Sequence, residues 1–223
     1  GDIIVLMKSV FKYAVKTYCI YNPMEGVSLP RKKTSDIRLL DKKEQLCLEE
    51  YVSKIHNSTT LGITLAMTTG IRIGELCALQ WKDIDLEKRI LTVSKTVQRI
   101  QLHEADRKTK LIITEPKSES SKRIIPIPEA VVAFLKEMRE NDEDFVVSGT
   151  SRVIEPRTMQ YRFAKILKNV NLPSVHFHAL RHMFASNCIR LGFDIKALSE
   201  ILGHSSVEIT LNRYVHSSFE QKT

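Results

Sequence analysis

The sequence of 223 residues contains few cysteines and no CxxC pair. Its four cysteines are scattered, and each lies in an apolar helical pattern where a reduced cysteine serves as a small hydrophobic residue: Cys19, Cys47, Cys77 and Cys188. This usage argues against a disulfide framework and indicates a reducing, intracellular setting.

Long apolar runs are also missing. No stretch approaches the length of a membrane span, and the first residues lack the charged, apolar and small-residue segments of an export signal. We therefore expect a chain that is neither embedded in a membrane nor exported. Because it opens on Gly1 and moves directly into a helical pattern, we also expect it to be a piece of a longer protein.

Acidic residues are outnumbered by basic ones. Lys and Arg total 34 against 26 Asp and Glu, which gives a net charge of +8. This excess favours a polyanionic partner, most simply nucleic acid, while a basic protein without such a partner is the alternative.

Hydrophobic periodicity divides the chain into two helical regions with a linker between them. Residues 3–20 carry apolar side chains at three- and four-residue steps, which predicts an amphipathic helix. The segment after it contains Gly26, Pro30 and a basic run, which is typical of a linker across a charged surface or a solvated linker. A second domain begins near Leu39.

The second domain is predicted to be mainly α with a small antiparallel three-stranded β-sheet, an α+β fold. Asp41 followed three residues later by Glu44 indicates a capping box at its first helix. Runs rich in β-branched residues predict the three strands at 89–97, 111–116 and 122–127, with residues 103–110 at an exposed hairpin tip. Helices are predicted around 39–55, 60–70, 73–80, 128–140, 157–170, 178–192, 194–204 and 206–216.

Arg72 follows a glycine helix stop and precedes Glu75 by three positions. Residues three apart share a helix face, so Glu75 could hold or orient Arg72. The simpler interpretation is a surface ion pair, since such pairs are common and weak. Gly70 and Gly74 favour the first interpretation because they leave room for a backbone or a phosphate to approach.

Three basic residues lie on the predicted hairpin EPKSESSKRIIPIP. Lys117 is near the turn, where a flexible ammonium can reach beyond the sheet, whereas Lys122 and Arg123 lie in the returning strand. The default interpretation is that they are solvated charges on an edge strand. Only a target phosphate nearby would make one of them catalytic.

The segment SVHFHALRHMFASN concentrates histidines: His176, His178 and His182 lie around Arg181. The i, i+4 spacing of His178 and His182 also suits zinc ligands on a helix. No glutamate adjoins the first histidine, no third ligand is evident, and an arginine is a poor neighbour for a dication. We therefore expect no metal, and Arg181 favours an anion.

Taken together, the order Arg, Lys, His-x-x-Arg, His, Tyr resembles the catalytic domain of the tyrosine recombinases, also called phage integrases. The motifs TGIRIGEL, HALRH, LGHSS and the tyrosine of TLNRYVH carry the resemblance. It implies that family's catalytic-domain fold for residues 39–223, the last helix of a core-binding domain for 1–22, and a basic interdomain linker for 23–38. The long spacer and the hairpin resemble most the integrases of conjugative transposons and temperate phages.

The resemblance also implies roles for single residues. Tyr214 would attack a DNA phosphate and form a 3′-phosphotyrosyl link. Arg72 and Arg181 would clamp the phosphate oxygens, because a guanidinium fork matches phosphate geometry. His178 would assist proton transfer from Tyr214, and His204 would donate a hydrogen bond to the phosphate.

Lys117, with Lys122 as the alternative, would protonate the leaving 5′-oxygen, and Glu75 would orient its neighbours. His182 is expected to pack in the interior. The remaining basic positions are expected to contact DNA phosphates, namely Arg31, Lys32, Lys33, Lys122 and Arg123.

The implied activity is site-specific recombination that integrates and excises a mobile element. It needs no metal, cofactor or ATP, in agreement with the absence of a GxxxxGK[ST] loop. The implied partners are double-stranded DNA attachment sites and three further copies of the chain in a homo-tetramer, with an excisionase or a host DNA-bending protein as a further candidate. The expected location is the cytoplasm of a bacterium, at the nucleoid. A type IB topoisomerase-like relaxing enzyme and a non-cutting regulator of excision are the alternatives.

Overall fold

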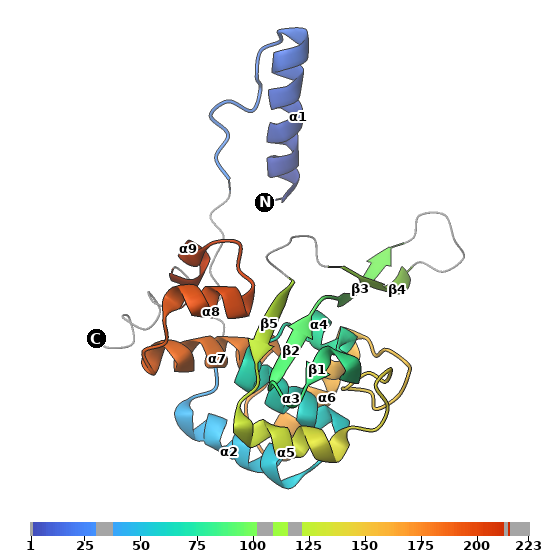
Figure 1. The fold of residues 1–223 in the computed structure, drawn as a ribbon. Helices are drawn as coiled ribbons and strands as arrows, with labels where there is room; N and C mark the ends of the chain where they lie inside the picture. The colour runs from blue at the N-terminus through green and yellow to red at the C-terminus, as the bar shows by residue number, and fades with distance from the viewer. Residues whose placement is uncertain (1, 30–37, 102–108, 116–121, 212–213, 215–223) are drawn as a thin grey trace. The chain divides into compact units, whose positions relative to one another are not determined.

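The computed structural model describes residues 2–29, 38–101, 109–115, 122–211 and 214 (Figure 1). The chain divides into two compact units, residues 1–37 and 38–223. Helix α1 (Asp2–Tyr18) forms most of the described part of the first unit, close to the predicted span of 3–20. A turn follows at Asn22, whose carbonyl oxygen accepts from the backbone N–H of Glu25 over 3.1 Å. None of the helices in the described ranges is long and apolar enough to cross a membrane.

The described part of the second unit is mainly helical, as predicted. The capping box at Asp41 and Glu44 is present, with both reciprocal hydrogen bonds formed over 2.9 Å. The helices are α2 (Lys42–Lys54), α3 (Ser58–Thr69), α4 (Ile73–Ala78), α5 (Glu129–Met138), α6 (Pro156–Asn169), α7 (His178–Arg190), α8 (Ile195–Leu202) and α9 (Val207–Thr210), with a 3-10 turn at Trp81–Asp83.

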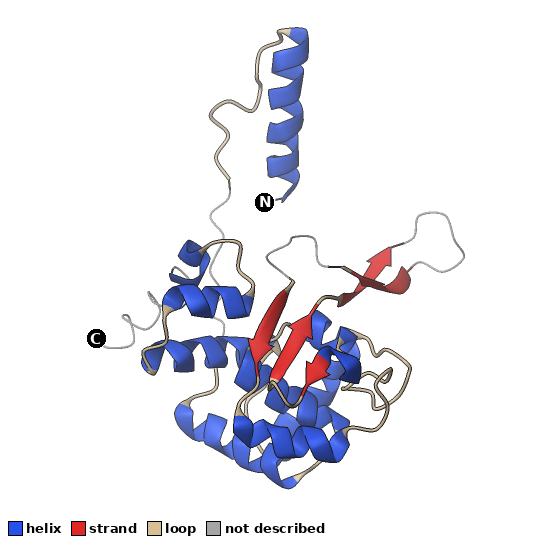
Figure 2. Cartoon of the chain, viewed as in Figure 1, coloured by secondary structure: helices blue, strands red, loops and turns tan. Residues whose placement is uncertain are grey.

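The strands form one antiparallel sheet of three strands and a separate antiparallel ribbon of two (Figure 2). The sheet has the order β1 (Ile84–Asp85), β2 (Ile90–Val93) and β5 (Arg123–Pro126), and the ribbon pairs β3 (Thr96–Gln101) with β4 (Thr109–Thr114).

The three-stranded sheet therefore exists, but its members differ from those expected. The predicted strand 89–97 divides at Ser94 and Lys95, where the chain changes its pairing partner from β5 to β4. The third predicted strand belongs to the sheet and the second to the ribbon. Strand propensity marks where strands lie, but it does not identify their partners, which explains the difference.

Helix α3 runs through the hydrophobic core. Its side chains are apolar around most of the circumference, and Leu61, Ile63 and Leu65 have no exposed surface. A helix of this kind is stable only when neighbouring elements cover it on all sides. Packing against α2, α5, α6 and α7 provides that cover and fixes the position of the turn that follows α3.

A second, smaller cluster of buried residues lies among the last helices. It contains Ala185 and Cys188 from α7, Leu198 and Leu202 from α8, and Tyr214. Tyr214 is thereby held against the two helices that carry the HALRH and LGH motifs.

Candidate active site

The turn between α3 and α4 depends on Gly70. This residue ends α3 in the left-handed conformation, with φ of 65°, and its N–H donates to the carbonyl of Ala66. A Cβ added at Gly70 would lie 2.5 Å from Cδ1 of Phe184 and 2.9 Å from Cδ2 of Leu202. Both the conformation and the close packing therefore require glycine at this position.

Arg72 and Glu75 form the predicted pair at the start of α4. The backbone N–H of Arg72 donates to Glu75 Oε2 over 3.0 Å, and Arg72 Nη1 donates to Oε1 over 2.8 Å. The side chain of Glu75 is only 5 % exposed, whereas that of Arg72 is 34 % exposed. The surface ion pair that served as the simpler interpretation is therefore wrong, because the carboxylate is buried.

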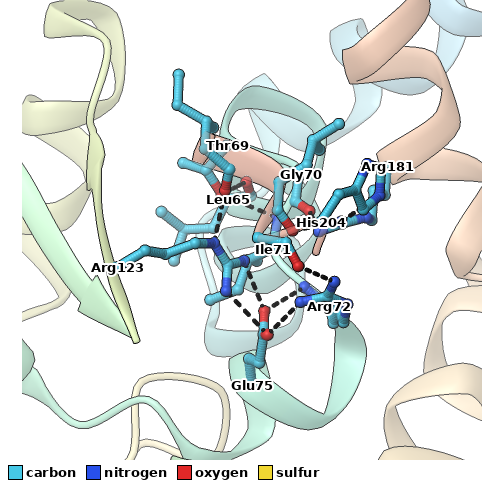
Figure 3. Close-up of polar contacts among 12 residues, drawn as sticks. Leu65, Thr69, Gly70, Ile71, Arg72, Glu75, Arg123, Arg181 and His204 are labelled. Carbon is cyan, nitrogen blue, oxygen red and sulfur yellow. Dashed lines mark hydrogen bonds and ion pairs between the residues drawn. The ribbon is translucent and has the colours of Figure 1, made fainter. Parts of the chain in front are cut away.

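Arg123 binds the same carboxylate from the sheet (Figure 3). Its Nη1 and Nη2 donate to the two oxygens of Glu75 over 3.0 and 2.8 Å. The expectation of a solvated edge-strand charge at Arg123 is wrong, since the side chain is 6 % exposed. The cause is strand alternation: Arg123 and Ile125 point inward, while Ile124 between them is 60 % exposed.

The charge of Glu75 is stabilised by its neighbours. Burial alone would raise the pKa of this carboxyl group, but the hydrogen bonds and positive charge of Arg123, together with the charge of Arg72, outweigh it and lower the pKa. Glu75 is therefore an ionised, acceptor-only group with two hydrogen bonds from each arginine.

The C-terminal end of α8 supplies three consecutive carbonyl oxygens to three arginines. Arg123 Nε donates to Ile201 over 2.6 Å, Arg181 Nη2 donates to Leu202, and Arg72 Nη2 donates to Gly203 over 2.7 Å. The last carbonyls of a helix have no partners within it and carry a partial negative charge, so cations are favoured there. The LGH turn thus brings together an arginine that precedes α4, one from β5 and one from α7.

Arg181 is the most deeply buried of these arginines, with 2 % exposure. Its Nη1 donates to the carbonyl oxygen of Gly70 over 2.7 Å. Burial, aided by the nearby charge of Arg72, lowers the pKa of Arg181 to about 9, which leaves the guanidinium charged at neutral pH. HALRH and TGIR therefore meet through this hydrogen bond.

His204 lies directly beside Arg181. Its Nε2 is 3.1 Å from Arg181 Nη2, and its Nδ1 is 2.8 Å from Thr210 Oγ1. Because a guanidinium can only donate, Nε2 of the neutral ring is the acceptor, and the ring proton on Nδ1 is donated to Thr210. Thr210, which has no exposed surface, was not among the predicted site residues.

Tyr214 is enclosed by two histidine rings. Its ring centroid lies 5.1 Å from that of His182 and 6.1 Å from that of His204, and the His204 ring is nearly parallel to it. The tyrosine is 1 % exposed and is therefore buried beside these rings. His182 is 7 % exposed, which confirms its expected packing role, and its ring also contacts that of His178, with centroids 4.9 Å apart.

Of the two hairpin lysines and the basic residues of the linker, the structure describes Lys122 alone. Lys122 is exposed and lies 2.7 Å from Glu115 Oε2 through its Nζ. The predicted residues Lys117, Arg31, Lys32 and Lys33 lie outside the described residues. Within the described ranges, no three His, Cys, Asp or Glu side chains come together as potential metal ligands.

Comparisons with known proteins find related sequences. Residues 38–221 match the model of the phage integrase family. A tyrosine recombinase XerC-like protein of Caldanaerobacter subterraneus subsp. tengcongensis is 32 % identical, over 97 % of this chain and 62 % of the relative. The transposase from transposon Tn916 of Enterococcus faecalis is 28 % identical, over 81 % of this chain and 47 % of the relative. The chain therefore spans less than two thirds of the length of either relative.

Solved structures show the same fold. The integrase of transposon Tn1549 in complex with transposon right end DNA is 25 % identical, with a TM-score of 0.74 over 96 % of this chain and 76 % of that one. A lambda integrase dimer bound to a COC′ core site is 21 % identical, with a TM-score of 0.62 over 95 % of this chain and 71 % of that one. These similarities confirm the predicted catalytic-domain fold, mainly helical with a small antiparallel β-sheet, to which the structure adds the two-stranded ribbon.

Proposed function

Since the chain belongs to the phage integrase family, we propose that it carries the catalytic centre of a site-specific DNA recombinase that cuts and rejoins strands through a 3′-phosphotyrosyl intermediate. One observation supports this above all others. Arg72, Arg181 and His204 converge on the C-terminal end of α8, and Tyr214 stacks on His204. A phosphate clamp and a nucleophile of this type suffice for transesterification without a metal ion.

In the proposed reaction, the oxygen of Tyr214 forms a bond to phosphorus, and the bond from phosphorus to the 5′-oxygen breaks. His178 accepts the proton of Tyr214, and Lys117, with Lys122 as the alternative, gives a proton to the departing 5′-oxygen. Religation reverses these transfers with a 5′-hydroxyl of another strand. The free energy of the broken bond is retained in the phosphotyrosyl link, so no nucleotide cofactor is needed.

Arg72 and Arg181 bind the non-bridging oxygens in this scheme. Both side chains are already held by protein acceptors, Arg72 by Glu75 and Gly203 and Arg181 by Gly70 and Leu202. Each guanidinium has five N–H donors, so hydrogen bonds to protein leave others for the phosphate. Groups oriented in advance in this way cost little reorganisation during the reaction. His204 would add a hydrogen bond to the same phosphate once its Nε2, which accepts from Arg181 in the free chain, takes up a proton and becomes a donor.

We further propose that the substrate is a double-stranded DNA attachment site of a mobile element, bound by a homo-tetramer, with an excisionase or a host DNA-bending protein as an additional partner. The excess of basic residues and the similarity to the Tn916 transposase support this proposal. Residues 1–22 would be the last helix of a core-binding domain and 23–38 the linker whose cations meet phosphates, in a protein that acts in the bacterial cytoplasm at the nucleoid.

The test is covalent trapping on a nicked suicide duplex that carries a candidate attachment site. The wild-type chain is expected to form a protein–DNA adduct in the presence of EDTA, and Tyr214→Phe is expected to bind the duplex normally but to form no adduct. An unchanged adduct yield from Tyr214→Phe would show that Tyr214 is not the nucleophile. Relaxation of supercoiled DNA by a monomer without recombinant products would instead favour the topoisomerase-like alternative.

A further inference from the structure

Arg123 is an arginine that the proposed chemistry does not use. It lies on β5, outside the four sequence motifs, and its guanidinium is more deeply buried than that of Arg72. All three of its nitrogens donate to protein acceptors: Nε to Ile201, and Nη1 and Nη2 to the two oxygens of Glu75. Hydrogen bonds to charged groups in a buried site are among the stronger ones in proteins, so this arrangement is rigid.

Arg123 also contacts both groups that hold Arg72. Arg72 donates through Nη1 to Glu75 and through Nη2 to the carbonyl oxygen of Gly203. Glu75 is hydrogen-bonded to Arg123, and Gly203 packs on the same guanidinium so closely that an added Cβ would lie 3.1 Å from Nη1 and from Cδ of Arg123. The two acceptors that set the direction of Arg72 are therefore positioned by a single side chain.

We propose that Arg123 is a positioning residue: by holding Glu75 and the Gly203 turn, it directs the Arg72 guanidinium toward the scissile phosphate. This inference rests on the proposed function. It gives Arg123 no contact with DNA and assigns its effect to Arg72.

Charge supports the same role. In the cluster, three guanidinium groups, those of Arg72, Arg123 and Arg181, surround the carboxylate of Glu75, which leaves an excess of two positive charges. Without Arg123, the buried carboxylate would have Arg72 as its hydrogen-bonded cation, and the positive charge offered to a phosphate would fall. Arg123 thus neutralises Glu75 and leaves the charge of Arg72 for the substrate.

The geometry requires arginine rather than any cation. A lysine at position 123 would keep the charge, but its single nitrogen cannot reproduce a two-point contact with a carboxylate and a third bond to Ile201. Arg123→Lys therefore keeps the positive charge but removes the geometry of the hydrogen bonds, so its effect reports on the geometry alone. Arg123→Met removes both while it retains much of the apolar volume of the side chain.

The experiment measures adduct formation on the nicked suicide duplex in a single turnover at saturating DNA, with the dissociation constant for the same duplex measured separately. We expect Arg123→Met to slow adduct formation by on the order of 10- to 100-fold, as displaced catalytic groups do, and to change the dissociation constant by less than about threefold. Arg123→Lys is expected to be slowed as well, although it keeps the charge.

A double-mutant cycle with Glu75→Gln tests whether Arg123 acts through Glu75. Two residues that act as a unit are not additive, so Arg123→Met is expected to slow the Glu75→Gln chain much less than it slows the wild-type chain. Additive effects on the rate would overturn the inference. Adduct formation by Arg123→Lys at the wild-type rate would also overturn the inference. If Arg123→Met does not fold, the Arg123→Lys variant provides the test by itself.

The matched control is Arg99→Met. Arg99 also forms a two-point ion pair, with Glu155 over 2.6 and 2.7 Å, but this pair joins β3 to the start of α6 and lies outside the arginine cluster. The Arg99→Met variant should form the adduct at the wild-type rate at saturating DNA. A decrease in rate equal to that of Arg123→Met would overturn the inference. Absence of adduct from the wild-type chain would overturn the proposed function, whereas an unslowed Arg123→Met chain beside an active wild type would overturn this inference alone.

Discussion

The guanidinium of Arg181 donates to the carbonyl oxygen of Gly70 over 2.7 Å, across 111 positions of sequence. Gly70 can present this oxygen because it ends α3 in the left-handed conformation with no side chain between itself and Phe184. A helix stop that is visible in the sequence thus also serves as the acceptor for a buried cation.

Gly70→Ala is expected to destabilise the fold and to slow adduct formation. The left-handed conformation costs an alanine about 1–2 kcal/mol, and the overlap with Phe184 and Leu202 adds about 1–3 kcal/mol. Urea unfolding measures the total. Gly149→Ala is the control, because Gly149 has nearly the same φ of 64° but no atom within 4 Å of the added Cβ. Equal losses in the two variants would contradict the packing argument.

Thr210→Val is expected to slow adduct formation on the order of tenfold, because the His204 ring loses the acceptor for its Nδ1 proton and with it a fixed orientation. Thr210→Ser keeps a hydroxyl group and should restore most of the rate. Thr68→Val is a suitable control, since the hydroxyl of Thr68 donates only within α3, to Thr64 and Leu65. Single-turnover trapping distinguishes these outcomes, and a Ser variant as slow as the Val variant would argue against the hydrogen bond.

The sequence predicted the parts of the site that depend on local spacing. Arg72 and Glu75 pair because residues three apart share a helix face, and the Asp41 capping box follows a local rule of the same kind. Gly70 was recognised as a helix stop for a similar reason. Such features depend on a few neighbouring residues, so they can be predicted without knowing the tertiary contacts of the rest of the chain.

Arg123 was misjudged because its environment comes from distant residues. The alternation of β5 could have indicated the inward face, since Arg123 shares it with Ile125, but only the fold brings Glu75 and the end of α8 to that face. The acceptor at Thr210 was missed because a threonine in a short helix has no distinguishing pattern. The proposed roles of the site residues stay predictions until they are tested.

Lowering the pH should reveal how much the buried carboxylate of Glu75 contributes to the free energy of unfolding. The pKa of Glu75 is below its ordinary value of 4.5 in the folded chain, so its ionised form stabilises the fold above that value, and this contribution is lost as the pH falls through the lowered pKa. At neutral pH Glu75→Gln is expected to cost about 3–5 kcal/mol of unfolding free energy, as the breaking of a buried ion pair does. Urea unfolding of both chains should show a difference that is constant above pH 5 and shrinks in more acidic buffer. A difference independent of pH would contradict the ionised state.

The identity of the general acid is testable with a modified substrate. Lys117→Ala is expected to lose cleavage of ordinary DNA on the order of 100-fold or more and to regain it on a duplex whose 5′ leaving group needs no proton. Lys122→Ala should be affected less, and the better leaving group should bring no specific recovery, since the Lys122 ammonium is held beside Glu115 at 2.7 Å. Recovery in Lys122→Ala alone would exchange the two assignments.

The acceptors at the end of α8 come late in the chain, whereas two of the three arginines that they bind, Arg72 and Arg123, come much earlier. Arg72 meets Gly203 across 131 positions and Arg123 meets Ile201 across 78. During synthesis from the N-terminus, the first of these contacts cannot form until residue 203 has been made, and the closure of such long loops also slows folding. A growing chain therefore lacks the complete arginine cluster, and the proposed DNA cleavage would become possible only once nearly the whole second unit has been synthesised.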